Sequence, residues 1–158
     1  WHLRCGSVDE FLAVELPGRP FVCLLAWDAA GECVATIGAV VDALLDAGCA
    51  FLCTYGADCE RVDDICDEEM VLRGIDTPPQ PHVMTTWHTN DSREAVLFFF
   101  LGCTPIDEGS AADGYAPWGA PCRDAIVVEI GAPLFDREWL RAVLRDPRRF
   151  RDGYEERP

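Results

Sequence analysis

The sequence contains no lysine. All thirteen of its basic residues are arginines. This absence excludes Schiff-base chemistry and a lysine-dependent phosphate loop, because both need the lysine amine. The glycine patterns GxGxxG and GxxxxGK[ST], which cradle nucleotide phosphates, are also missing. The chain therefore carries none of the common signatures of nucleotide binding.

Long apolar runs and close cysteine pairs are also absent. The longest apolar runs, residues 21–27 and 95–101, fall far short of the roughly 20 residues that a membrane span needs. No basic-then-apolar signal peptide opens the sequence. The nine cysteines are odd in number and form no CxxC pair, which disfavours a disulfide framework and a structural zinc site. We therefore expect a protein of the reducing cytoplasm with no membrane partner.

The charge is strongly negative and unevenly distributed. The whole chain carries −15, and residues 1–136 hold 23 acids against 6 arginines. Residues 137–158 hold 5 acids and 7 arginines, several at helical spacing, which predicts a basic but solvated helix face. An acidic surface repels nucleic-acid backbones and attracts basic proteins. We expect a protein partner, basic in character, and no nucleic acid.

Strand-like and helix-like segments alternate along the chain. Apolar strand patterns are predicted at residues 20–28, 50–55, 82–88 and 124–131. Helical periodicity is predicted at residues 33–49, 56–74, 91–102 and 135–146. This alternation is typical of α/β proteins with a parallel sheet.

The predicted fold is an α/β three-layer sandwich in a single domain, residues 1–146. Four mostly parallel strands are flanked by about four helices. The predicted order is 2-1-3-4 in the chain numbering of these strands, which places 20–28 beside 82–88 at the centre. Residues 147–158 are predicted to form a charged, frayed tail.

A site is expected at the carboxyl ends of the strands, where the strand order reverses. Under the predicted order, this crevice brings Asp28 and His88 together. His88 is a candidate catalytic base because histidine titrates near neutral pH, and Asp28 is a candidate nucleophile or ligand of a divalent metal. Each also has a structural interpretation, Asp28 as a hydrogen-bond acceptor in its own turn and His88 as a partner of the backbone. Outside this hypothesis we expect no cofactor and no metal site.

Cys59 is a third candidate catalytic residue. It lies in the first turn of a predicted helix, where the helix N-terminus lowers a thiol pKa. The neighbouring acids Asp58, Glu60 and Asp63 act in the opposite direction. Aspartates before three predicted helices are expected to act as N-caps, namely Asp58, Asp91 and Asp136.

Aromatic residues indicate two further kinds of contact. Trp27, Trp87 and Tyr55 end or follow predicted strands and are candidate ligand-binding residues of the same crevice. Tyr115 and Trp118 lie in a long loop, residues 103–123, and are candidate anchors for a protein partner. In an all-parallel sheet this loop lies at the end opposite the crevice, so we expect it to form a contact surface.

One family resemblance accompanies these patterns. The run TTWH-x4-REAVLFFFLG, preceded by YGADCERVDDICDE, resembles a family of small bacterial proteins known as a domain of unknown function. The resemblance covers most of the chain and implies a compact α/β domain of bacterial origin. It implies no reaction and carries over no catalytic residues.

Three hypotheses of function follow from the sequence. The first is an acidic cytoplasmic interaction protein that binds a protein partner, in regulation or in neutralising a basic toxin. The second is a metal-assisted hydrolase that uses Asp28 and His88 at the carboxyl ends of strands 20–28 and 82–88. The third is a small-ligand sensor that uses the same crevice. Because catalytic signatures are missing, we expect the first, a binding protein and no enzyme.

Overall fold

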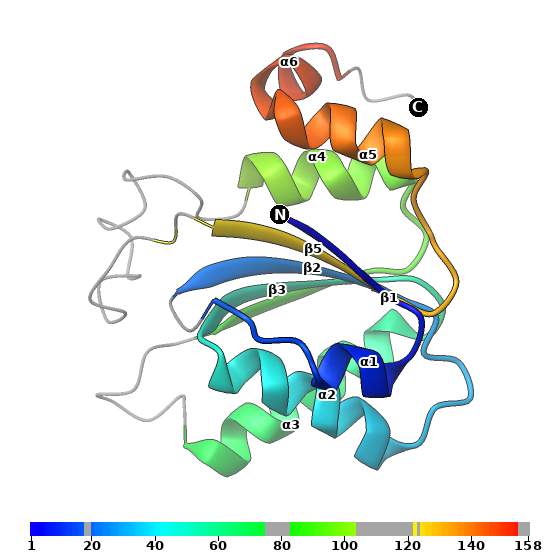
Figure 1. Ribbon diagram of the computed structural model, residues 1–158. Coiled ribbons are helices and arrows are strands. Elements are labelled where there is room, and N and C mark those ends of the chain that lie inside the picture. The colour runs from blue at the N-terminus through cyan, green and yellow to red at the C-terminus, as the bar shows by residue number, and fades with distance from the viewer. Residues whose placement is uncertain (18–19, 75–82, 104–121, 123, 155–158) are drawn as a thin grey trace.

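The computed structural model describes residues 1–17, 20–74, 83–103, 122 and 124–154. Five parallel strands form one sheet between two layers of helices (Figure 1). The strands are β1 (His2–Cys5), β2 (Phe21–Trp27), β3 (Cys49–Tyr55), β4 (Met84–His88) and β5 (Asp124–Ile130). The helices are α1 (Val8–Leu12), α2 (Val34–Asp46), α3 (Cys59–Arg73), α4 (Arg93–Cys103), α5 (Arg137–Arg145) and α6 (Pro147–Asp152). The predicted α/β class and three-layer arrangement are confirmed.

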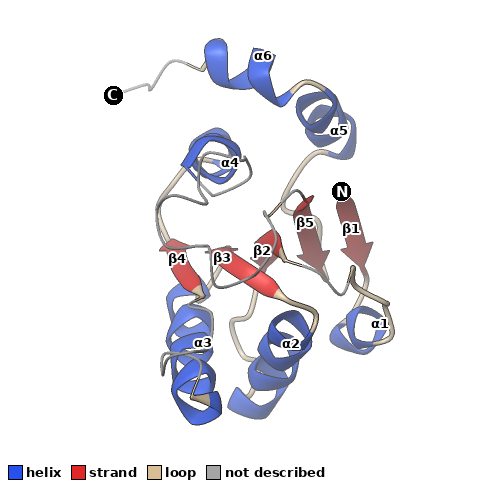
Figure 2. Cartoon of the chain, turned by 90° about the vertical axis from the view of Figure 1, so that its left-hand side faces the viewer, coloured by secondary structure: helices blue, strands red, loops and turns tan. Residues whose placement is uncertain are grey.

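The helices cover the two faces of the sheet in separate groups. Helices α1, α2 and α3 lie on one face, and α4, α5 and α6 lie on the other (Figures 1 and 2). On the first face Leu25 packs with Ile37 of α2, and on the second Leu24 packs with Phe100 of α4. Each fully buried side chain of this size stabilises the fold by about 1.5–3 kcal/mol. We call the first group the lower layer and the second group the upper layer.

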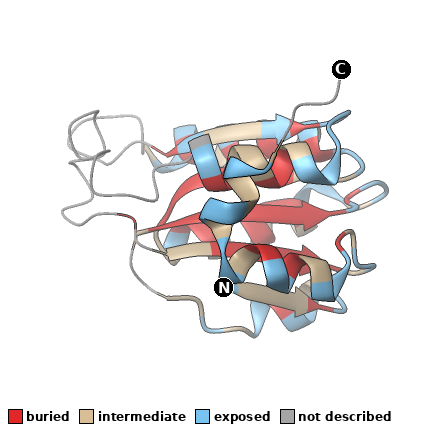
Figure 3. Cartoon of the chain, turned by 90° about the horizontal axis from the view of Figure 1, so that it is seen from above, coloured by how far each residue is buried: buried red, intermediate tan, exposed pale blue. Residues whose placement is uncertain are grey.

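Burial explains why β2 reads as a continuous apolar run. All seven of its residues are buried (Figure 3). A central strand of a parallel sheet has helices on both faces, so neither set of alternating side chains meets water. By contrast, β4 exposes Met84 and Trp87, as befits a strand at the edge of the sheet.

The predicted strand order is wrong in detail. The observed order is β1-β5-β2-β3-β4, so β3 lies between β2 and β4. From β2 to β4 each strand is added beside the previous one through a helix of the lower layer, and α4 then crosses the upper face to β5. The most apolar strands thereby occupy the centre. The polar sequence MTTWH, which contains Thr85 and Thr86, fits the edge.

Three elements at the ends of the chain were not predicted, namely β1, α1 and α6. Strand β1 pairs with β5 and makes the second edge of the sheet. Within the predicted tail, α6 extends to Asp152 and packs through Phe150 and Tyr154, which contact each other and the side chains of Trp139 and Phe98. Residues 147–152 of the predicted tail therefore form a helix that belongs to the upper layer.

Candidate functional site

The turn after β2 is tied to the turn after β3 by a network around Arg61. The Arg61 guanidinium donates to Asp58 Oδ2 at 2.6 Å and to the carbonyl oxygens of Ala29 and Glu32 at 3.1 and 3.0 Å. The Ala29 amide also donates to the Ala57 carbonyl at 3.0 Å. These bonds give the carboxyl end of the sheet a fixed backbone.

Asp28 uses its side chain within its own turn. Its Oδ1 accepts a hydrogen bond from the Ala30 amide at 3.2 Å, and the residue is exposed. This geometry matches the structural interpretation of Asp28. Because β3 lies between the strands that carry Asp28 and His88, those strands are two spacings apart, about 10 Å. The predicted crevice between neighbouring strands is therefore not formed.

His88 is buried and held by a carboxylate. Its Nδ1 lies 2.7 Å from Asp91 Oδ2, and its ring packs on Phe99 with centroids 4.9 Å apart. The residue is 8 % exposed, and Nε2 lies 3.5 Å from Thr86 Oγ1. The predicted partner of the histidine, a backbone group, is replaced by a side chain. The contact between Asp91 and His88 Nδ1 is of the kind that fixes the orientation of an imidazole ring, although little of this ring reaches solvent.

The predicted N-caps have three different outcomes. Ser92, and not Asp91, caps α4, because Ser92 Oγ accepts from the Ala95 amide at 3.1 Å. Asp58 occupies the N-cap position of α3 with a left-handed φ of 64°, but its side chain makes no cap bond and pairs with Arg61. Asp136 is confirmed as the cap of α5, accepting from the Trp139 amide at 2.8 Å.

Cys59 lies at the start of α3 but is only 1 % exposed. Its Sγ is 3.7 Å from Thr89 Oγ1, and its carbonyl accepts a hydrogen bond from the Thr54 hydroxyl at 2.9 Å. The thiol therefore packs between α3 and the segment after β4. Among the described residues, no group of three or more His, Cys, Asp or Glu side chains could hold a metal ion.

The candidate aromatic residues do not form one surface. Trp27 is buried in the lower layer, whereas Tyr55 packs toward the upper layer against Phe135. Trp87 is 51 % exposed on the edge strand. Tyr115 and Trp118 lie outside the described residues. The arrangement gives no support to the small-ligand sensor, because a buried Trp27 offers no face to a ligand.

Cys33 is a chemically distinct thiol that the sequence interpretation passed over. It is the N-cap residue of α2, and its Sγ lies 3.1 Å from Thr36 Oγ1. The hydrogen bonds from the Thr36 side chain and then from the Thr36 backbone lower the pKa of this thiol. By contrast, burial raises the pKa of Cys66 to about 12. The sequence pattern C-x-x-T, Cys33 to Thr36 at the start of a predicted helix, could have identified this thiol, because it resembles a helix-capping motif.

We expect Cys33 to react first with iodoacetamide at neutral pH. It is the one exposed cysteine among the eight whose side chains the structure describes, and thiolate fraction and access both favour it. Mass spectrometry of a time course measures the site of modification. Cys33→Ser should remove the fast phase, whereas Cys59→Ser should leave it intact. Early labelling of Cys59 would contradict the structure.

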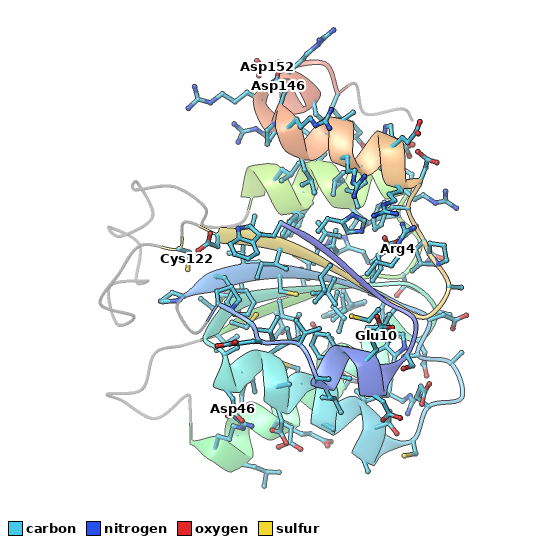
Figure 4. The ribbon with its side chains drawn as sticks, viewed as in Figure 1. Arg4, Glu10, Asp46, Cys122, Asp146 and Asp152 are labelled. Carbon is cyan, nitrogen blue, oxygen red and sulfur yellow. The ribbon has the colours of Figure 1, made fainter. Side chains whose placement is uncertain are left out.

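Glu129 is a second residue that sequence analysis missed. It is fully buried on β5 and accepts hydrogen bonds from His2 Nε2 at 2.7 Å and Arg4 Nη2 at 2.6 Å. Its other oxygen accepts from the Leu134 and Phe135 amides, each at 2.9 Å. Burial raises the pKa of this carboxyl, but the bonds from His2, the Phe135 amide and Arg4, with the charge of Arg4, outweigh burial and lower it to about 2. Figure 4 labels Arg4 near this site.

Asp63 is the third missed residue, and its environment differs from that of Glu129. It is 2 % exposed, and its Oδ1 has no hydrogen-bond partner within the described part of the chain. Its Oδ2 lies 3.4 Å from the hydroxyl of Thr85, which also lies 3.1 Å from Asp67 Oδ1. Burial and then the charge of Asp67 raise the pKa of Asp63 to about 7. A buried, unpaired carboxyl of this kind favours the arrival of a cationic group.

Charge is divided between the two helical layers. Helices α1, α2 and α3 together hold ten acids and two arginines. Helices α5 and α6 hold six arginines and two acids, and α4 holds one of each. Since these layers lie on opposite faces of the sheet (Figure 1), the molecule has an acidic lower face and a basic upper one.

Comparison with known proteins gives one match. A family described as a domain of unknown function (DUF7684) matches residues 7–144. No curated protein and no solved structure matches the chain. None of the helices in the described ranges has the length and apolar character that crossing a bilayer requires.

Proposed function

The chain belongs to this family of unknown function, and we propose that it is an acidic interaction protein whose lower layer binds a basic protein partner. One observation carries the proposal: the ten acids and two arginines of α1, α2 and α3 share one face, while the arginine-rich helices lie on the other. Segregated charge steers and orients a partner of opposite sign. Regulation of a basic protein, or neutralisation of a basic toxin, fits such a surface.

The proposed setting is the reducing cytoplasm. Of the eight cysteines whose side chains the structure describes, seven are buried. Buried thiols of this kind act as small apolar side chains, a use that suits a reducing compartment. Nucleic acid is not the proposed partner, because the lower layer would repel its phosphates.

Affinity capture from a native lysate tests the proposal, first at low salt and then at moderate salt. The test variant neutralises three exposed acids of α3, namely Glu60→Gln, Asp64→Asn and Glu68→Gln. The matched control makes the same charge change on the upper layer with Glu94→Gln, Glu138→Gln and Asp152→Asn. We expect one basic protein to be retained by the wild type and the control and lost from the α3 variant. Each neutralised charge near the interface should reduce the association rate and its salt dependence.

A hydrolase is the second candidate, favoured by the 2.7 Å contact between His88 and Asp91. A carboxylate on Nδ1 orients a histidine so that Nε2 can act as a base. The low exposure of His88 argues for a packing role instead. In the capture experiment His88→Ala should retain the partner. Two results together would overturn the interaction proposal in favour of the enzyme. The first is that neither the wild type nor any variant captures a partner. The second is that the wild type hydrolyses small phosphoesters and His88→Ala does not.

A further inference from the structure

The outer edge of β4 carries backbone groups that no strand in the described part of the chain pairs with. Within the described residues β4 pairs only with β3. The Thr54 hydroxyl of β3 donates to the Thr86 carbonyl at 3.3 Å, so the carbonyl of Thr86 points toward β3. In a parallel ladder the backbone groups of successive residues point to opposite sides of the strand. The N–H and C=O groups of Thr85 and Trp87 therefore point away from the sheet, where another strand could pair.

An acidic stripe of α3 runs beside this edge. The stripe consists of Glu60, Asp63, Asp64 and Asp67, which recur at helical spacing on one side of α3. Contact of Asp63 and Asp67 with the Thr85 hydroxyl fixes that side toward β4. The buried Oδ1 of Asp63 has no hydrogen-bond partner in the described part of the chain. A cationic group that reached it would form the strongest new charge-assisted hydrogen bond of the stripe.

The spacing of the stripe matches that of an extended strand. Asp63 and Asp67 are four residues apart on a helix, a rise of about 6 Å. Alternate side chains of a strand lie about 6.6–6.8 Å apart and point to the same face of the sheet. A strand added at β4 would thus present every second side chain to successive acids of α3. Trp87, which points to the α3 side as Thr85 does, offers an aromatic face to an arginine there.

Charge also decides between a second copy of this chain and a basic partner. If two copies joined their β4 strands antiparallel in one continuous sheet, both acidic stripes would lie on the same face and repel each other. A basic segment has the complementary charge and meets no such repulsion.

We infer that the partner contributes an extended segment with a basic residue at every second position, which adds to the sheet along β4 with those residues facing Asp63 and Asp67. The inference rests on the proposed function and specifies how its partner is held. Backbone pairing with Thr85 and Trp87 supplies affinity, and the acids of α3 select the basic side chains.

Two peptides of identical composition test this mode of binding. In the first, arginine and valine alternate; in the second, the arginines form one block and the valines another. Fluorescence anisotropy with the full chain should show the alternating peptide binding about tenfold more tightly, because only it can pair its backbone while facing all its arginines to α3. On binding, hydrogen exchange at the Thr85 and Trp87 amides should slow, whereas the Thr86 amide should not change.

Paired variants separate local recognition from general attraction. Asp63→Asn with Asp67→Asn should weaken the alternating peptide about tenfold. The control, Asp9→Asn with Glu15→Gln, changes the charge equally in α1 and in the segment just after it. Helix α1 lies beneath the opposite edge of the sheet (Figure 2), so the control should change affinity less than about twofold. Equal binding of the two peptides, equal effects of the two variant pairs, or unprotected Thr85 and Trp87 amides would overturn the inference. The proposed function would then still stand if the captured partner is lost from the variant that neutralises Glu60, Asp64 and Glu68.

Discussion

Replacing Glu129 by glutamine is expected to lower the free energy of unfolding by about 3–5 kcal/mol. The carboxylate accepts from His2, Arg4 and two backbone amides while fully buried. A glutamine can keep one acceptor oxygen, but its NH₂ group would then face the donors of His2 and Arg4. The substitution thus leaves the Arg4 guanidinium with its bond to the Phe135 carbonyl but without its anion, and it leaves a ring N–H of His2 unpaired.

Urea unfolding followed by circular dichroism measures the effect. Glu10→Gln is the matched control, because Glu10, labelled in Figure 4, also accepts a hydrogen bond from the backbone, that of Gly6 at 2.6 Å, but is exposed. We expect it to cost less than about 1 kcal/mol. Similar losses for the two variants would show that the cluster around Glu129 does not hold β1 on the sheet.

The contribution of Glu129 also has a defined pH dependence. Its pKa is about 2 in the folded chain, against an ordinary value of 4.5. Because the folded value is the lower one, the stabilisation is fully present above about pH 4.5 and is lost as the pH falls toward 2. The difference in stability between wild type and Glu129→Gln should therefore narrow over this range. A constant difference would mean that the charge of Glu129 contributes nothing.

The sequence predicts the layers of this fold better than the order of its strands. The hydrophobic periodicity locates β2, β3, β4 and β5 and the helices between them. A strand buried on both faces reads as a continuous apolar run, whereas a helix buried on one face shows apolar residues at helical spacing. Strand order depends on which strand can tolerate exposure. The threonines of β4 and the apolar run of β5 carried that information, and the prediction did not use it.

The site was less predictable because its determinants are contacts between distant segments. His2 and Arg4 alternate with Leu3 and Cys5, which is a strand pattern, but nothing local shows that they meet Glu129. His88 was identified, yet its partner depended on Ser92 taking the capping role from Asp91. Asp63 lies in a run of acids that reads as solvated, and only its packing against β4 reveals its burial.

Gly56→Ala is expected to cost about 4 kcal/mol, which combines about 1–3 for backbone strain with about 1–3 for overpacking. Gly56 has a φ of 122°, and an added Cβ would lie 2.3 Å from the carbonyl oxygen of Trp27. That oxygen belongs to the backbone at the end of β2 and cannot rotate away. The turn after β3 would have to lift off β2.

Gly31→Ala is the matched control, because Gly31 also has a positive φ, of 90°, but an added Cβ there meets nothing within 4 Å. It should cost only about 1–2 kcal/mol, the strain alone. Thermal unfolding of both variants measures the difference. A displaced turn would also pull Arg61, which follows Gly56 closely, from its bonds to the carbonyl oxygens of Ala29 and Glu32 in the turn after β2. Hydrogen exchange at the Ala29 amide, which bonds the Ala57 carbonyl, should then rise in Gly56→Ala and stay unchanged in Gly31→Ala. Equal costs for the two variants would show that the two turns are not in close contact.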